Sequence, residues 1–185
     1  ETWLAKNTVL VFTSDHGYHM GEHGYWQKTT LFENAARVPL IIAAPGMTAG
    51  GKTVSAPAEM VDFYPTLAEL CGLTAPASLP GVSLAETLND AEARPRDSAF
   101  TQYGSGYSIR TDRYRYTEWG ENGKDGAELY DHQSDSAEMV NLARRAANAE
   151  TAARLSKVLR QRITYAGKPP KGIKQIRFEN RRRVR

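Results

Sequence analysis

The stretch TVLVFTSDHGYHMGEHGYWQK, residues 8–28, decides how the chain is interpreted, because an apolar run ends there in a loop rich in metal-binding side chains. Residues 9–12 are apolar without alternation, which is typical of a strand buried on both faces of a largely parallel sheet. Three of the four histidines of the chain follow within the same stretch. We therefore expect a buried strand whose carboxyl end opens into a polar loop.

Asp15 and His16 come directly after this predicted strand. In open α/β sheets, ligands bind at the carboxyl ends of the strands, where loops leave the core. A carboxylate and an imidazole at such a place are a plausible pair of metal ligands, and Gly17 would let the backbone turn without a Cβ clash. The tripeptide also fits a plain turn that ends a strand.

A second polar turn bracketed by glycines follows at residues 21–24, and Lys28 comes shortly after Tyr25 and Trp26. A lysine that emerges from an aromatic setting can act as a point charge for an anion. A surface lysine is the alternative interpretation.

Four motifs follow one another in the first part of the chain: TSDHG at residues 13–17, GEHG at 21–24, WQK at 26–28, and RVPLII at 37–42 with Pro45-Gly46. Their order and spacing resemble those in the C-terminal half of a type I sulfatase of the alkaline-phosphatase-like superfamily. The nearest subgroup is the enzymes similar to iduronate-2-sulfatase. SIRTDRYRY at 108–116 and ELYD at 128–131 resemble the closing subdomain of the same enzymes, so the resemblance spans roughly residues 10–142.

The resemblance implies a role for each polar residue of the loop. Asp15 and His16 would be ligands of the active-site cation, which is calcium in these sulfatases, although the residues themselves leave Zn²⁺ or another divalent cation open. Lys28 would contact the sulfate group and stabilise the negative charge that develops as the ester bond breaks. His23 would line the pocket and take part in catalysis or, with Glu22, orient the loop.

Tyr18 and His19 project from the same loop. By the resemblance they would shape a substrate-binding subsite for the sugar, and the alternative is that both face solvent. His132, which follows ELYD, is expected to be structural.

The nucleophile of the family has no counterpart here. Sulfatases use a cysteine in a Cys-x-Pro-Ser-Arg run, which is oxidised to formylglycine. The one cysteine, Cys71, lies in Leu-Cys-Gly-Leu and is expected to be a small core residue of a helix. The resemblance therefore implies a missing N-terminal half that carries the nucleophile and the remaining metal ligands, and a chain that is inactive alone. Such a chain would be a fragment, a cleaved subunit or a natural truncation.

The fold class expected is α/β, namely the C-terminal portion of an alkaline-phosphatase-like mixed sheet with flanking helices, plus a small antiparallel sheet packed with a C-terminal helix. Residues 1–97 would belong to the sulfatase core, 98–166 to the antiparallel subdomain, and 167–185 to a basic tail. Within the core part, residues 53–60 are a weak strand candidate, and Asp62 is placed to cap a helix that begins at Phe63.

The composition, with 41% hydrophobic and 24% charged residues, is ordinary for a globular protein. No apolar run approaches the roughly 20 residues of a membrane helix, and no signal peptide is visible. Five of the last nine residues are arginine, which predicts a solvated tail or a polyanion-binding run. We expect a sulfated carbohydrate as partner and neither nucleic acid nor membrane; a periplasmic, secreted or lysosomal location is implied only by the resemblance.

Two other functions fit the pattern. One is hydrolysis of a phosphate or phosphonate ester by an enzyme of the same superfamily, in which a strand-end Asp-His pair binds zinc. The other is a non-catalytic remnant that binds sulfated glycans through Lys28 and the arginine-rich tail.

Overall fold

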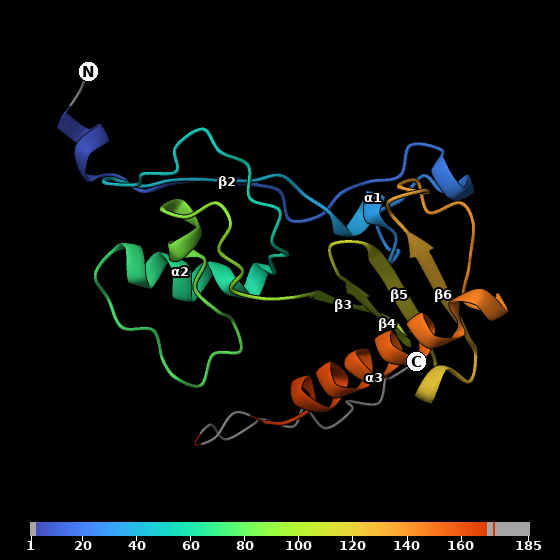
Figure 1. The fold of residues 1–185 in the computed structure, drawn as a ribbon. Coiled ribbons are helices and arrows are strands. Elements are labelled where there is room, and N and C mark those ends of the chain that lie inside the picture. The colour runs from blue at the N-terminus through green and yellow to red at the C-terminus, as the bar shows by residue number, and fades with distance from the viewer. Residues whose placement is uncertain (1–2, 170–171, 173–185) are drawn as a thin grey trace, which may run out of the picture.

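The computed structural model describes residues 3–169 and 172, and its chain forms two sheets that lie side by side (Figure 1). The first half contains two short strands and two α-helices, and the second half contains four strands followed by a long helix. The strands are β1 (Leu10–Thr13), β2 (Leu40–Ala43), β3 (Ala99–Tyr103), β4 (Gly106–Arg110), β5 (Tyr114–Trp119) and β6 (Gly126–Asp131). The α-helices are α1 (Glu33–Ala36), α2 (Phe63–Leu70) and α3 (Ala149–Ala166), with 3₁₀ turns at Trp3–Asn7, Glu22–Gly24, Met60–Asp62, Ala85–Leu88, Glu121–Gly123 and Ala146–Asn148.

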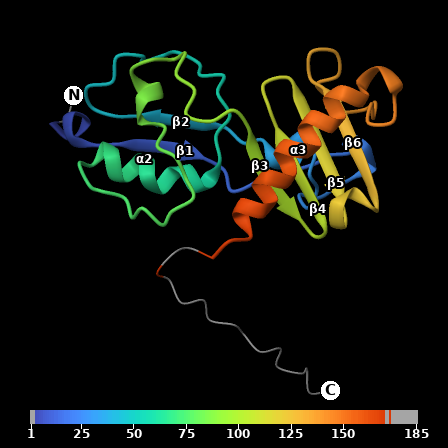
Figure 2. The same ribbon diagram turned by 60° about the horizontal axis from the view of Figure 1, so that its bottom comes forward.

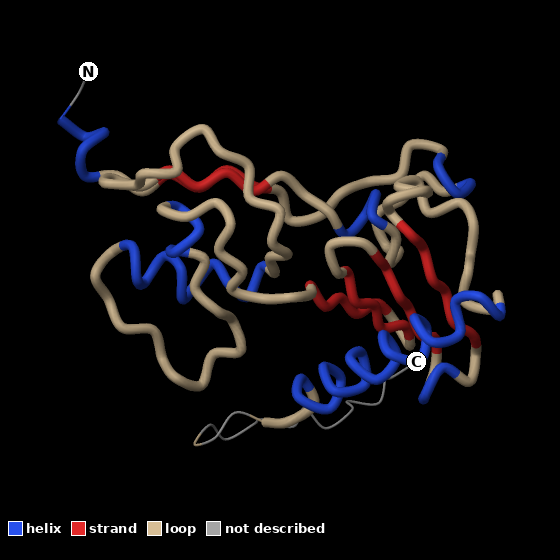
Figure 3. Tube along the Cα trace, in the orientation of Figure 1, coloured by secondary structure: helices blue, strands red, loops and turns tan. Residues whose placement is uncertain are grey.

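Strands β1 and β2 form a two-stranded sheet on their own (Figure 3). They run antiparallel, in a register from Leu10 opposite Ala43 to Thr13 opposite Leu40. The expectation that residues 9–12 form a strand buried on both faces of a largely parallel sheet is therefore wrong for the described residues, since the pairing is antiparallel and Phe12 is 58% and Ile41 is 56% exposed. An unbroken apolar run indicates a strand that needs cover on both faces, but it carries no information about the direction of the neighbouring strand.

The segment between β2 and β3 contains α2, and it differs from the prediction in three details. Residues 53–60 form no strand. Asp62 does not cap α2 with its side chain but turns back to accept a hydrogen bond from the Glu59 backbone N–H (2.8 Å). Cys71 is exposed rather than buried, since it lies past the last residue of α2, whose buried residues are Thr66 and Ala68.

The second sheet has the strand order β3-β4-β5-β6, and all three pairs are antiparallel. This is the small antiparallel sheet that the sequence predicts. Figure 2 shows α3 lying across one face of this sheet, where its Leu155 and Leu159 join Ile109 and Leu129 in a core whose members are fully buried. Glu118 of β5 accepts hydrogen bonds from α3 as well, including one from Arg160 Nε (3.1 Å).

The opposite face of the same sheet is polar and lies against α1. Ser108, Arg115 and Thr117 point to this side, since they alternate with the core residues along β4 and β5. Glu33, the first residue of α1, accepts a hydrogen bond from the guanidinium of Arg115. The sheet is thus sandwiched between α3 and the segment that follows the polar loop.

The boundary at residue 97 is followed at once by β3, and α3 ends at Ala166. The division into domains stays a prediction, and the arginine-rich run at residues 177–185 lies outside the described residues. None of the described helices has the length and apolar character that crossing a bilayer requires.

Candidate active site

The polar loop after β1 is folded into an irregular hairpin that returns to its own start. The backbone N–H of His19 donates to the carbonyl of Gln27, and that of Gly21 donates to the carbonyl of Tyr25 (both 2.9 Å). The tip is the 3₁₀ turn Glu22–Gly24, in which His23 has a φ of 56°. This pairing brings Lys28 back beside the strand end where Asp15 and His16 lie.

Asp15, His16 and Lys28 meet at one place on the surface. The Lys28 ammonium nitrogen lies 2.9 Å from His16 Nε2, and the Asp15 carboxylate oxygen Oδ2 lies 3.5 Å from the same ring nitrogen. The side chain of Asp15 is 83% exposed and that of His16 is 33% exposed, so the cluster is open to a ligand. The three residues that the sequence singled out for the metal and the anion are therefore neighbours.

The hydrogen bonds of His16 define its tautomer. Nδ1 lies 2.7 Å from the carbonyl oxygen of Gly17, which can only accept, so Nδ1 carries the proton. The lone pair of Nε2 is then free to accept from the Lys28 ammonium. Metal-binding histidines commonly donate the ring N–H that does not face the metal to a backbone carbonyl or a carboxylate, which fixes the orientation of the ring.

Asp15 and His16 fit part of a divalent-cation site. Asp15 offers a hard carboxylate, and His16 offers the lone pair of Nε2. Both groups lie near the Lys28 ammonium group, which is itself a cation. Calcium takes six to eight oxygen ligands, so two residues are too few to hold it by themselves. Any further ligands must come from outside this cluster.

Gly17 has a steric role that differs from the expected turn. A Cβ at this position would lie 1.9 Å from the carbonyl oxygen of Asn34 and 3.2 Å from that of Arg37. The Gly17 N–H also donates to the Ala35 carbonyl (2.9 Å). The loop therefore rests directly on α1, and only glycine permits the approach.

The other loop residues lie apart from this cluster. Tyr18 is 53% exposed, and its hydroxyl donates to the Trp26 carbonyl (3.0 Å). His19 is fully buried, with Nε2 2.7 Å from Thr30 Oγ1, so the solvent-facing alternative is wrong for this residue. In this conformation His19 supports the loop from within, whereas Tyr18 remains available on its surface.

His23 stacks on Phe32, with ring centroids 3.9 Å apart and ring planes inclined by 9°. It lines a shallow cavity of about 790 Å³ together with Glu22, Asn34 and Arg37. The Met20 N–H donates to the Glu22 carboxylate (2.6 Å), and backbone hydrogen bonds of this kind lower the pKa of Glu22. The geometry therefore favours an orienting role for Glu22 and His23 over direct catalysis.

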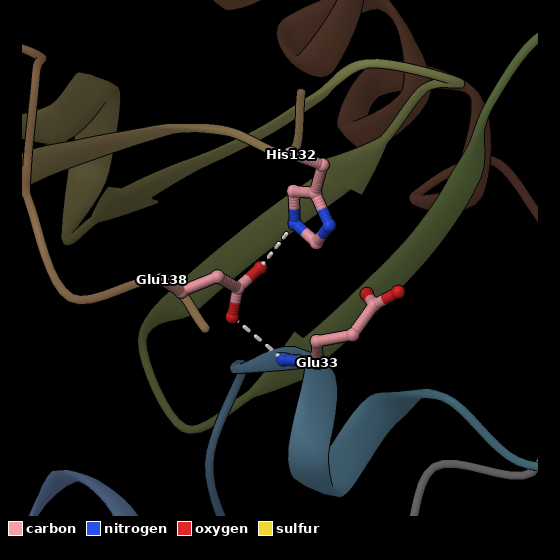
Figure 4. Close-up of side chains that lie close together, drawn as sticks. All are labelled: Glu33, His132 and Glu138. Atoms are coloured by element: carbon pink, nitrogen blue, oxygen red, sulfur yellow. Dashed lines mark hydrogen bonds and ion pairs between the residues drawn. The ribbon is translucent and has the colours of Figure 1, made fainter. Parts of the chain in front are cut away.

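Glu33, His132 and Glu138 form a second group of metal-capable side chains, shown in Figure 4, with ligand atoms within 4.8 Å of one another. Their ligand atoms already have partners. Arg115 Nε donates to Glu138 Oε1 (2.6 Å), and Arg110 Nη2 lies 3.0 Å from His132 Nδ1. Two guanidinium groups balance the two carboxylates, so we interpret this group as an ion network and not as a metal site.

The sequence interpretation missed this network, although it expected a structural His132. The available signal was Arg115 itself, a charged residue at an inward position of a β-rich run. Burial raises the pKa of Glu138, but the hydrogen bond from His132 and the charge of Arg115 outweigh it and hold that pKa below its ordinary value. Glu138 is therefore a carboxylate in the folded protein.

Comparison with known proteins gives a consistent picture. The family model described as N-sulphoglucosamine sulphohydrolase, C-terminal, matches residues 21–164. A sulfatase of Formosa agariphila is 41% identical over 141 residues, which are 75% of this chain and 27% of that protein. Iduronate 2-sulfatase of Mus musculus is 33% identical over 63% of this chain and 33% of its own length.

Two solved structures extend this likeness to the fold. A protein in complex with its substrate, D-glucosamine-2-N,6-O-disulfate, superposes with a TM-score of 0.80 at 31% identity over 91% of this chain and 37% of that one. A phosphonate monoester hydrolase of Silicibacter pomeroyi gives 0.74 at 31% identity over 86% of this chain and 35% of its own. The chain thus spans about a third of the length of the proteins it matches. It belongs to the N-sulphoglucosamine sulphohydrolase C-terminal family, and therefore to the sulfatases.

Proposed function

We propose that this chain supplies the cation-binding and sulfate-contacting side of the active site of a sulfuric ester hydrolase that acts on a sulfated carbohydrate. The observation that carries the proposal is the meeting of Asp15, His16 and Lys28 at the end of β1. A carboxylate, an imidazole lone pair of fixed tautomer and an ammonium group together suit a divalent cation and the anion that it binds.

Each residue has a distinct task in this proposal. Asp15 and His16 Nε2 would hold the cation, calcium by family, which when bound would supply positive charge beside the sulfate group. The Gly17 carbonyl keeps the His16 proton on Nδ1. Lys28 turns its ammonium group toward a sulfate oxygen and stabilises the charge that grows as the S–O ester bond breaks.

We further propose that a missing N-terminal part supplies the formylglycine nucleophile and the remaining cation ligands. Two observations support this. The chain spans 27% of the length of the Formosa agariphila sulfatase. In addition, apolar residues of β1 and β2 lie exposed, and a two-stranded sheet is marginal without further strands or cover. The chain alone would then be inactive.

Two relatives support a proposal for the substrate class. One matched structure holds a disulfated glucosamine, and another relative is named for iduronate. We propose that the substrate is a sulfated sugar of a glycosaminoglycan, either a sulfated glucosamine or a 2-sulfated uronate. Tyr18 would lie at the edge of the subsite that binds it.

The test uses the chain joined to an N-terminal part that carries the nucleophile, assayed on an aryl sulfate. Asp15→Asn and Lys28→Ala are each expected to lower kcat/KM about 100-fold or more, the loss seen when one stabilising group of an oxyanion is removed. Lys52→Ala, in an exposed turn, is the matched control and should leave the rate unchanged. Full activity in Lys28→Ala would overturn the proposal.

Hydrolysis of a phosphonate or phosphate ester is the second candidate, because the phosphonate monoester hydrolase matches at 31% identity. The same protein assayed on aryl sulfate, aryl phosphate and phenylphosphonate esters separates the two. A higher kcat/KM on the phosphorus esters would assign the chain to that class.

A further inference from the structure

A buried ion network contacts both the side chain and the backbone of Glu33, the first residue of α1. Arg115 of β5, whose side chain is 3% exposed, donates through Nε to Glu138 Oε1 (2.6 Å) and through Nη2 to Glu33 Oε2. Glu138 Oε2 also accepts from the backbone N–H of Glu33 (2.7 Å). Both the main chain and the side chain of Glu33 are therefore fixed by the closing sheet.

Helix α1 cannot fix its own position. It has four residues and no side-chain cap, and helices far longer than this are marginal in water without tertiary contacts. Its anchors are the buried Ala35, the ring of Phe32 against Tyr130 and the ion network at Glu33. Removal of the network would therefore loosen the amino-terminal end of α1, which would keep only the apolar contacts.

Helix α1 in turn carries the loop that ends in the proposed site. The Gly17 N–H is bonded to the Ala35 carbonyl, and the absent Cβ of Gly17 leaves room for the Asn34 carbonyl. The Gly17 carbonyl then accepts from His16 Nδ1 (2.7 Å). A contiguous series of contacts thus leads from Arg115 and Glu138 through α1 to the ring of His16.

We propose that Arg115 and Glu138 are positioning residues for this site. They hold α1 against Gly17 and so fix the orientation of His16 toward Asp15 and Lys28, without touching the substrate. The proposal rests on the proposed function for its catalytic meaning, but the geometry that it describes can be measured in the 185-residue chain itself.

The experiment compares Arg115→Met with Arg113→Met in the full chain. Arg113 lies two residues earlier, in the turn just before β5, and pairs with Asp131 (2.6 Å), but its side chain is 46% exposed and it makes no hydrogen bond to α1 among the described residues. Amide hydrogen exchange at Gly17 is the first readout, because that N–H is held by the Ala35 carbonyl. The second is the ring ¹⁵N spectrum of His16, which reports its tautomer.

In Arg115→Met we expect the protection of the Gly17 amide to fall at least tenfold and the single Nδ1–H tautomer pattern of His16 to be lost. Arg113→Met should preserve both. Arg115→Lys, which keeps the charge but not the forked geometry, should give an intermediate loss and remains informative if the Met variant does not fold. Unchanged Gly17 protection and tautomer in a folded Arg115→Met or Arg115→Lys protein would overturn the proposal.

These outcomes are independent of the proposed reaction. Full sulfatase activity in Lys28→Ala would remove the reaction while leaving the exchange result intact. Conversely, an inactive Lys28→Ala with an unperturbed Gly17 in the Arg115 variants would keep the reaction and reject the positioning role.

Discussion

The two sheets of this chain differ in what covers them. In the four-stranded sheet, Ile109 and Leu129 are fully buried under Leu155 of α3. In the two-stranded sheet, Leu10 is 53% and Phe12 is 58% exposed. The closing sheet and α3 form a core that this chain completes by itself, whereas β1 and β2 carry the proposed site on a sheet that needs further cover.

Charged groups also join the first half of the chain to the closing sheet and α3, at the segment before α2. Arg96 donates from Nε to Asp62 Oδ2 (2.9 Å) and from Nη1 to Glu59 Oε1 (2.7 Å). Arg162 of α3 reaches the same Glu59 oxygen (2.5 Å). The segment that leads into α2 is thereby fastened to the helix of the closing sheet.

The largest loss of stability is expected when the ion pairs of Arg96 are removed. Arg96→Met would leave the fully buried carboxylate of Asp62 without its countercharge. Loss of one partner of a buried ion pair costs about 3–5 kcal/mol of unfolding free energy, which urea denaturation measures. Arg94→Met is the matched control, because the Arg94–Asp112 pair is exposed and worth about 1 kcal/mol or less. Equal losses in the two variants would contradict the importance of burial.

The next effect contrasts the two apolar regions directly. Leu155→Ala removes a fully buried side chain and should cost about 2–5 kcal/mol, whereas Leu10→Ala should cost about 1 kcal/mol or less because half of its side chain is already exposed. The same urea transitions measure both. In the chain joined to the N-terminal part that we propose, Leu10→Ala should approach the cost of a core residue. A cost that stays near 1 kcal/mol there would mean that β1 is not covered.

The elements that could be predicted are those with local signals. Strands β3 and β5 coincide with short β-rich runs of the sequence, which tight turns at residues 104–105 and 120–125 follow. The meeting of Asp15 with Lys28 was also predictable, because a strand end and a glycine-bracketed turn lie close in sequence. The roles of these residues in binding and catalysis stay predictions.

The remaining features depend on partners that are distant in sequence. Glu33 and Glu138 are joined across 105 residues, and nothing near either residue indicates the other. Cys71 was expected in the core of a helix, but it lies just past Leu70, the last residue of α2, and is exposed. The antiparallel pairing of β1 with β2 was not predictable either, because two apolar runs fit a sheet in both directions.

The smallest expected effect is on the pH dependence of stability, which should differ between the ion network of Glu138 and that of Glu59. Glu138 has a lowered pKa, so the unfolded chain binds more protons, and its stabilising contribution is present above the unfolded pKa of about 4.3 and is lost as the pH falls through the folded pKa. Burial raises the pKa of Glu59, although Arg96 and Arg162 oppose this, so its contribution has the opposite sign and grows as the pH falls.

Glu138→Gln should therefore make stability fall less steeply as the pH drops below about 4.3, whereas Glu59→Gln should make stability fall more steeply as the pH drops toward about 4.3 from above, each by about 1.4 kcal/mol per unit of pKa difference. Urea titrations at several pH values measure both slopes. Glutamine keeps the size and one acceptor of the side chain, so a change of slope reports the carboxylate charge rather than lost packing. If both variants flattened the profile, Glu59 would be held as a carboxylate like Glu138, and the two networks would not differ in electrostatic character.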